Sequence, residues 1–168
     1  MNTNIATQFP TETYSDCPAP LMPLSYDWAA LKTAIDGFYP AGNTNQAIGL
    51  QWAFQSLTAS PFTIPPKQQN YIYNDIIILM TDGLNTQNRW SSNQSDIDAR
   101  EKKLCANIKA ANIAIYTIFV NTGGDPSQQV LKDCASDATK AFEIKSSNQL
   151  LAIFTTIGTQ LSQLRIAK

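Results

Sequence analysis

Two short motifs hold the side chains of this sequence that are best suited to chemistry. Thr44 lies in the run Gly42-Asn43-Thr44-Asn45, and Asp82 lies in Thr81-Asp82-Gly83. Each motif falls where a loop meets an expected helix or strand, so its side-chain oxygen can point into a cleft above a sheet. A hydroxyl and a carboxylate are hard oxygen ligands that suit Mg²⁺ or another divalent cation. Taken singly, each motif has a structural alternative, because threonine often caps helices and Asp-Gly often ends strands.

The strand expected at residues 75–81 is the element that must position Asp82. Its consecutive apolar residues are too many for a half-exposed strand, and they are typical of a parallel strand buried on both faces. The run ends abruptly at Thr81-Asp82-Gly83. Open α/β sheets bind ligands at the carboxyl ends of their strands. The sequence therefore predicts an ion or ligand site at this end of the sheet.

The remaining pattern predicts alternating helices and strands. Residues 1–20 are a polar, extended lead-in with a short strand near 19–24, Asp27 caps a helix ending near Gly37, and Thr44 opens a second helix. After a loop at 58–73 and the buried strand, we expect a helix at 95–111, a strand at 113–120, a helix from Asp125-Pro126 through Cys134, an edge strand at 140–145 and a last helix capped by Ser147. This order predicts a three-layer, doubly wound and mostly parallel α/β fold of the Rossmann-like kind.

Composition excludes several classes of function. The chain has 168 residues, which suits one domain, and a net charge of -1 without a basic run, so we expect no nucleic-acid partner. It has no histidine, which removes histidine-based catalysis and histidine-ligated zinc. Without a second carboxylate cluster or a lysine clamp beside Asp82, a metal-assisted phosphatase lacks an acid–base pair. We therefore expect no catalytic residues and no enzymatic activity.

The sequence also contains three cysteines and one helix rich in charged residues. Cys105 and Cys134 fall in consecutive expected helices and could form a disulfide, or they could be two buried free thiols. Cys17 has no obvious partner. The charged residues of the helix at 95–111, among them Glu101, are expected to form a solvated face.

Together, the motifs resemble the von Willebrand factor A (VWA) domain. The family's metal-ion-dependent adhesion site combines an Asp-x-Ser-x-Ser motif on the first strand, a threonine from a later loop and an aspartate in a Thr-Asp-Gly-like turn. Thr44 matches that threonine and Asp82 that aspartate. More closely, the chain is similar to the C-terminal part of TadG-type pilus-assembly proteins in four stretches: Cys17-Pro18 through Gly42-Asn43-Thr44-Asn45, Ile48-Gly49-Leu50-Gln51-Trp52, Leu79-Met80-Thr81-Asp82-Gly83-Leu84-Asn85, and Gly158-Thr159-Gln160-Leu161-Ser162-Gln163-Leu164-Arg165.

The chain also departs from the family, because Asp-x-Ser-x-Ser occurs nowhere in it. By resemblance, residues 1–168 are a single, truncated VWA-like domain that begins after the first strand. Thr44 and Asp82 would then be a partial site that binds Mg²⁺ or another divalent cation weakly or not at all. A sheet without its middle strand exposes unpaired backbone, so we expect strand rearrangement, a domain swap or a homodimer.

The resemblance implies a non-enzymatic protein-binding or adhesion module of a bacterial Flp/Tad-type pilus-assembly system. Its partner would be a pilus or envelope protein, and a partner carboxylate would complete the coordination of the ion. The module would lie in the periplasm or at the cell surface, anchored to the inner membrane by a segment upstream of this chain. The alternative is a structural module that makes protein–protein contacts without a metal.

Overall fold

The computed structural model describes residues 19–58, 62, 64, 66–88 and 91–163, and the structural statements that follow concern these residues. The chain divides into two compact units, residues 1–43 and 44–168, which are described separately. Cys17 and most of the expected lead-in lie outside the described residues. No helix in the described part of the chain is both long and apolar enough to span a bilayer.

The first unit contains one described helix, α1 (Trp28–Asp36). The Asp27 side chain accepts a hydrogen bond from Ala30 N at 2.9 Å, which confirms the predicted N-cap, and Gly37 ends the helix. None of the helix residues is buried, and Trp28 is 73% exposed. The short strand expected near residues 19–24 is absent from the described residues 19–24.

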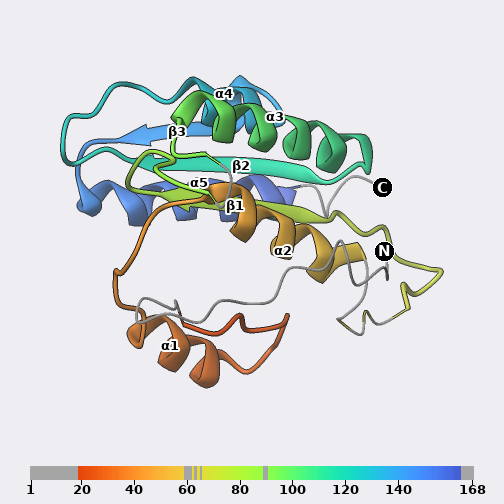
Figure 1. Ribbon diagram of the computed structural model, residues 1–168. Coiled ribbons are helices and arrows are strands. Elements are labelled where there is room, and N and C mark those ends of the chain that lie inside the picture. Colours follow the sequence, from red (N-terminus) through yellow and green to blue (C-terminus); the bar gives the residue numbers. More distant parts are fainter. Residues whose placement is uncertain (1–18, 59–61, 63, 65, 89–90, 164–168) are drawn as a thin grey trace. The chain divides into compact units, whose positions relative to one another are not determined.

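The second unit is built on a parallel sheet of β1 (Ile76–Thr81), β2 (Ala114–Val120) and β3 (Ala141–Ile144). The described strands lie in the order β1-β2-β3, and Figure 1 shows β2 between the other two. Ile76 pairs with Ala114 at one end of the first ladder, and Thr81 pairs with Phe119 at the other. This arrangement confirms the predicted parallel α/β sheet.

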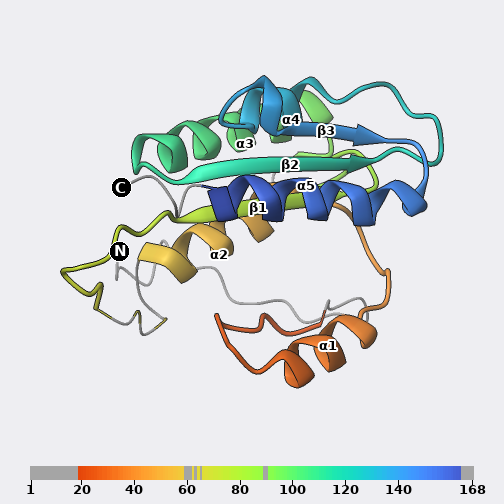
Figure 2. The ribbon, with the colours of Figure 1, turned by 180° about the vertical axis from the view of Figure 1, so that it is seen from behind.

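Helices cover both faces of the sheet, because successive residues of a strand point to opposite sides. On one face α2 (Gln46–Thr58), α3 (Gln94–Ala110) and α4 (Gln129–Cys134) enclose an apolar core that includes Leu50, Ile77, Ile108, Ile115, Phe119 and Leu131. On the other face α5 (Leu150–Gln163) packs through Ile157 against a core that includes Tyr116, Ile118 and Ile144. Figures 1 and 2 show α5 and the α3–α4 pair on opposite sides of the sheet. The three predicted layers are confirmed.

Three predicted helix starts are wrong. The helix expected from Thr44 begins at Gln46, and the one expected from Asp125-Pro126 begins at Gln129. Asn121 explains the second error, because its side chain accepts from Asp125 N (2.8 Å) and donates to Asp125 O (2.7 Å), which holds this segment as a loop. The last helix is preceded by a 3₁₀ turn whose capping box uses Ser146 rather than Ser147.

The outer edge of β1 is open among the described residues, since β1 pairs there only with β2. The prediction that this strand is buried on both faces is wrong, because on the face that α5 covers elsewhere Ile78 is 38% exposed and Met80 is 51% exposed. Natural sheets usually protect an edge strand with charged residues, prolines or bulges. The β1 sequence, IIILMT, contains no charge and no proline.

Candidate functional site

The structure fastens the segment containing Thr44 to the loop containing Asp82. Thr44 N donates to Thr86 Oγ1 at 2.8 Å, and Thr86 N donates to Thr44 O at 2.9 Å. Two residues later, Gln46 N donates to Asn85 Oδ1 at 2.8 Å. The start of α2 and the loop after β1 thus form one unit at the carboxyl end of β1, where ligands of open α/β sheets bind.

The two predicted metal ligands differ in their surroundings. Asp82 is exposed and Thr44 is half-buried. Within the described part of the chain, neither the Asp82 carboxylate nor the Thr44 hydroxyl makes a hydrogen bond or an ion pair. Both oxygens are therefore available to a ligand.

Asn45 and Gln46 add two side-chain oxygens that the sequence did not single out. Asn45 Oδ1 and Gln46 Oε1 are buried and have no hydrogen-bond partner among the described residues. Gln46 is only 6% exposed. Its Nε2 donates to Gly83 O at 3.0 Å, so rotating the amide by 180° would set Oε1 against another carbonyl oxygen. The orphaned position of Gln46 Oε1 is therefore fixed by its surroundings.

These four residues, Thr44, Asn45, Gln46 and Asp82, are called the loop cluster below. An unpaired buried oxygen costs about 1–3 kcal/mol, so each of these two oxygens calls for an explanation. Hydroxyl, carboxylate and amide oxygens are the ligand types that Mg²⁺ and Ca²⁺ take in proteins. The donor set therefore fits a hard divalent cation. Because it contains only one carboxylate, we expect the cation to bind weakly.

Behind the loop cluster, Asn85 connects it to α3. The buried Asn85 side chain donates from Nδ2 to Asp98 Oδ1 at 2.8 Å and to Glu101 Oε2 at 2.7 Å. The prediction that Glu101 belongs to a solvated helix face is wrong, because this side chain is 0% exposed. Burial raises the pKa of Glu101 from 4.5 to about 7, the bond from Asn85 opposes this rise, and the nearby Asp98 charge adds to it.

Glu101 also lies beside a disulfide. Cys105 and Cys134 are joined across α3 and α4, with their Cα atoms 5.1 Å apart and both side chains buried. The Cys134 sulfur is 3.8 Å from Glu101 Oε1. Glu101, Cys105 and Cys134 are called the core cluster below.

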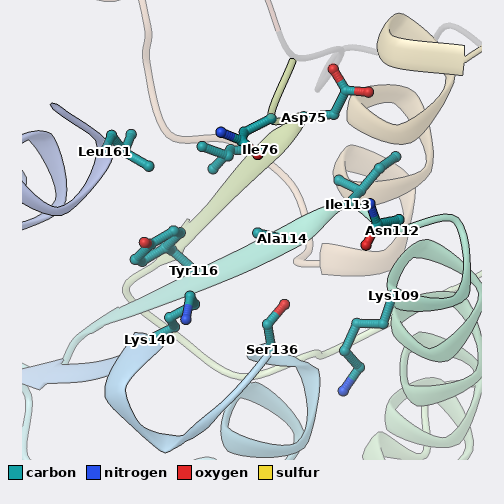
Figure 3. A pocket seen from close by; sticks show the side chains of 11 residues that line it. Asp75, Ile76, Lys109, Asn112, Ile113, Ala114, Tyr116, Ser136, Lys140 and Leu161 are labelled. Carbon is teal, nitrogen blue, oxygen red and sulfur yellow. The ribbon is translucent and has the colours of Figure 1, made fainter. Parts of the chain in front are cut away.

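A separate hollow of about 410 Å³ lies at the amino ends of β1 and β2 and is shown in Figure 3. Its charged side chains are already engaged. Lys109 donates to the carbonyl oxygens of Asp133 and Ala135, Lys140 pairs with Asp137, and Asp75 pairs with Lys67. With its charges satisfied within the fold, this hollow offers a ligand little electrostatic attraction.

Comparisons with known proteins bear on the fold and on the family of this chain. The sequence profile of the von Willebrand factor type A domain matches residues 3–156. Proximal thread matrix protein 1 from the mussel byssus superimposes with a TM-score of 0.51 and 21% identity over 77% of this chain and 27% of that one. A structure of that protein with a zinc-occupied MIDAS motif gives a TM-score of 0.52 and 23% identity, over 77% and 28% of the two chains. No curated protein matches this chain.

Proposed function

The chain belongs to the von Willebrand factor type A domain family, and from that premise we propose that it is a non-enzymatic protein-binding module assisted by a divalent cation at the loop cluster. Domains of this family are protein-interaction modules. Among the described residues, the oxygens of Asn45 and Gln46 lack partners, and their segment is hydrogen-bonded to the loop that follows β1 and holds Asp82; this is the observation that carries the proposal. A carboxylate of the partner protein could then coordinate the bound cation.

In this proposal, each residue of the loop cluster has a different role in binding the cation. Asp82 supplies the negative charge, and Thr44 supplies a neutral hydroxyl. Gln46 holds the Asp82 turn through its bond to Gly83 O while its own Oε1 stays free. Because the backbone on both sides is fastened by hydrogen bonds, the cluster is organised before any ligand arrives, which lowers the entropic cost of binding.

We further propose that the partner is a component of a bacterial Flp/Tad-type pilus-assembly system in the periplasm or at the cell surface. The resemblance of the four sequence stretches to TadG-type proteins supports this role. So does the Cys105–Cys134 disulfide, since disulfides persist in oxidising compartments such as the periplasm. In this proposal a segment upstream of the chain anchors the domain, which is a single VWA-like module, to the inner membrane.

A second candidate function is protein binding without a metal, through the open edge of β1. The exposed Ile78 and Met80 and the uncharged β1 sequence favour this mode. A strand from a partner, or from a second copy in a homodimer or domain swap, would satisfy the unpaired backbone groups of that edge. This mode predicts association that does not depend on divalent cations.

Thermal unfolding with EDTA, Mg²⁺ and Mn²⁺ separates the two candidates. A cation at a hundredfold excess over its Kd should stabilise the native protein by about 2.7 kcal/mol. Asp82→Asn should remove this response. Asp36→Asn, a change at an exposed helix carboxylate, should keep it. A response of equal size in Asp82→Asn would exclude the loop cluster as the site, and no response in any protein would favour the metal-independent mode.

A further inference from the structure

The core cluster has one feature that a structural disulfide does not require, which is the carboxyl group of Glu101. Glu101 and Cys105 are one helical turn apart on α3, so their side chains share a face. Cys134 reaches the same point from α4. One carboxylate oxygen and the two sulfurs lie within 4.8 Å of one another, and all three side chains are buried.

The short contact between Glu101 and Cys134 is not a hydrogen bond donated by sulfur. Glu101 Oε1 lies 3.8 Å from the Cys134 sulfur, but a disulfide sulfur carries no proton to donate. In the part of the chain that the structure describes, Oε1 therefore has no donor, while Oε2 accepts from Asn85. Among these residues, an ionised Glu101 would have only one of its two oxygens hydrogen-bonded and would form no ion pair.

Asn85 does not explain why residue 101 should be an acid. A glutamine there would still accept the Asn85 hydrogen bond, and its NH₂ group could face the disulfide without a desolvated charge. A buried carboxylate is costly unless it is paired or coordinates a metal. An acid at residue 101 gains a role that glutamine could not fill if the two neighbouring sulfurs can also act as metal ligands.

We propose that reduction of the Cys105–Cys134 disulfide converts the core cluster into a buried binding site for a zinc-class divalent cation. Two cysteine thiolates and a carboxylate are zinc ligands in proteins. The sulfurs of an intact disulfide are poor ligands, so the oxidised protein would not bind the cation there. This site is distinct in residues and chemistry from the all-oxygen loop cluster.

The reaction balances with a dithiol as reductant. The dithiol gives two electrons and two protons, its own sulfurs become a disulfide, and Cys105 and Cys134 become thiols. The cation then displaces the two thiol protons to solvent, together with the Glu101 proton where that group is protonated. Three anionic ligands around a 2+ ion leave one net negative charge. Because protons compete with the cation for every ligand, binding should strengthen as pH rises.

The change in geometry that this site needs is small. Two sulfurs bound to one tetrahedral zinc at about 2.3 Å lie roughly 3.7 Å apart, wider than the sulfurs of a disulfide. Rotation of the two cysteine side chains can supply this separation, since both project from helices that already pack together through the same apolar core.

Cobalt binding tests the proposal, because Co²⁺ reports thiolate ligation by a charge-transfer absorption. The Asp82→Asn chain, which lacks the carboxylate of the loop cluster, is unfolded, reduced with a phosphine and refolded with Co²⁺. The phosphine takes up the oxygen of one water molecule as the two thiols form. We expect one Co²⁺ per chain with thiolate absorption, and none at the core cluster of the oxidised protein. Adding Glu101→Gln should weaken Co²⁺ binding by about tenfold or more, as loss of a ligand requires.

Three results would overturn the proposal. These are a reduced, folded protein without thiolate–cobalt absorption, equal Co²⁺ affinity with and without Glu101→Gln, and unchanged absorption in a Cys105→Ala/Cys134→Ala variant. If the reduced chain does not fold alone, circular dichroism during Zn²⁺ titration decides instead. Zn²⁺-driven folding that Glu101→Gln weakens supports the site, and a chain that stays unfolded at saturating Zn²⁺ refutes it.

Discussion

The loop cluster and the core cluster are joined through Asn85 but satisfy their polar atoms in opposite ways. The loop cluster holds neutral oxygens and one exposed carboxylate that lack partners, at an end of the sheet where ligands arrive. The core cluster holds a buried acid against a closed disulfide. An unpaired group at an accessible place can be satisfied by binding, whereas one in the interior is satisfied by a change of protonation or of redox state. Each cluster should therefore respond to a different perturbation.

The largest expected effect on the free energy of unfolding comes from removing the disulfide of the core cluster. Cys105→Ala/Cys134→Ala should lower the free energy of unfolding by about 3 to 4 kcal/mol, because the disulfide closes a loop across a separation of 29 residues. Denaturant unfolding under oxidising conditions measures this loss. An unchanged midpoint in the double variant would mean that the core cluster does not depend on its closure.

The next effect comes from the charge of Glu101 and depends on pH. The folded pKa of about 7 lies above the ordinary value of 4.5, so the folded protein holds more protons than the unfolded chain between these values. Stability should therefore fall as pH rises from 4.5 through 7. At pH 8, Glu101→Gln should be more stable than the parent by about 3 kcal/mol, since one pKa unit is worth about 1.4 kcal/mol. At pH 4 the two should be nearly equal.

Urea unfolding of the oxidised protein from pH 4 to pH 8 checks this prediction. Asp98→Asn is the matched control, because Asp98 is the other carboxylate that accepts from Asn85 and it is only partly buried. Its stability should still fall between pH 4.5 and 7, but over a somewhat narrower range, because the Asp98 charge adds to the rise in the Glu101 pKa. A parent protein whose stability is flat between pH 4.5 and 7 would show that Glu101 is not a buried acid in solution.

Asn85→Ala should have a smaller effect, on the link between the two clusters. The change removes the acceptor for Gln46 N and the shared donor to Asp98 and Glu101. Leaving these groups unpaired should cost about 2 kcal/mol. It should also move the stability loss attributed to Glu101 to higher pH, because the Asn85 bond lowers the Glu101 pKa.

Asn85→Asp sharpens the same prediction. It keeps an oxygen for Gln46 N but places a third carboxylate beside Asp98 and Glu101. We expect its stability relative to the parent to be worse at pH 8 than at pH 5. An equal loss of stability at both pH values would show that residue 85 does not interact with the charges of Asp98 and Glu101.

The sheet and its helices could be predicted from the sequence because their signals are local. The consecutive apolar residues of β1 and β2, and the apolar spacing of α3, placed these elements to within about a residue. The start of α4 could not be placed, because Asn121, several residues earlier, holds Asp125 in a loop. Such a hydrogen-bonded contact outweighs the local capping preference of Asp125-Pro126, and the periodicity of apolar residues in the sequence does not indicate it.

The surroundings of the polar sites could not be predicted from the sequence, because they depend on contacts between segments that are far apart in the chain. The end of β1 indicated a position for Asp82, but the bonds between Thr44 and Thr86 join residues 42 apart. Glu101 has charged neighbours in sequence, and its burial follows from α4 and Asn85 packing over it. Nothing in the sequence distinguishes Gln46 Oε1 from an ordinary helix-surface amide, because its isolation is a property of the assembled loops.

The smallest expected effect on stability is that of Gln46→Met, and its sign tests the loop cluster most directly. The change keeps an unbranched side chain of similar size, loses the bond from Nε2 to Gly83 O, and removes the buried Oε1 that has no partner. The lost bond costs about 1 kcal/mol, and removing the unpaired oxygen returns about the same amount. Without cations the variant should therefore unfold within about 1 kcal/mol of the parent, while its stabilisation by Mg²⁺ or Mn²⁺ should be weaker. Gln51→Met, on the same helix, controls for the general effect of methionine. A variant that keeps the full cation response would show that Gln46 Oε1 is not a ligand, and one that loses several kcal/mol without cations would show that Gln46 serves mainly to hold the Asp82 turn.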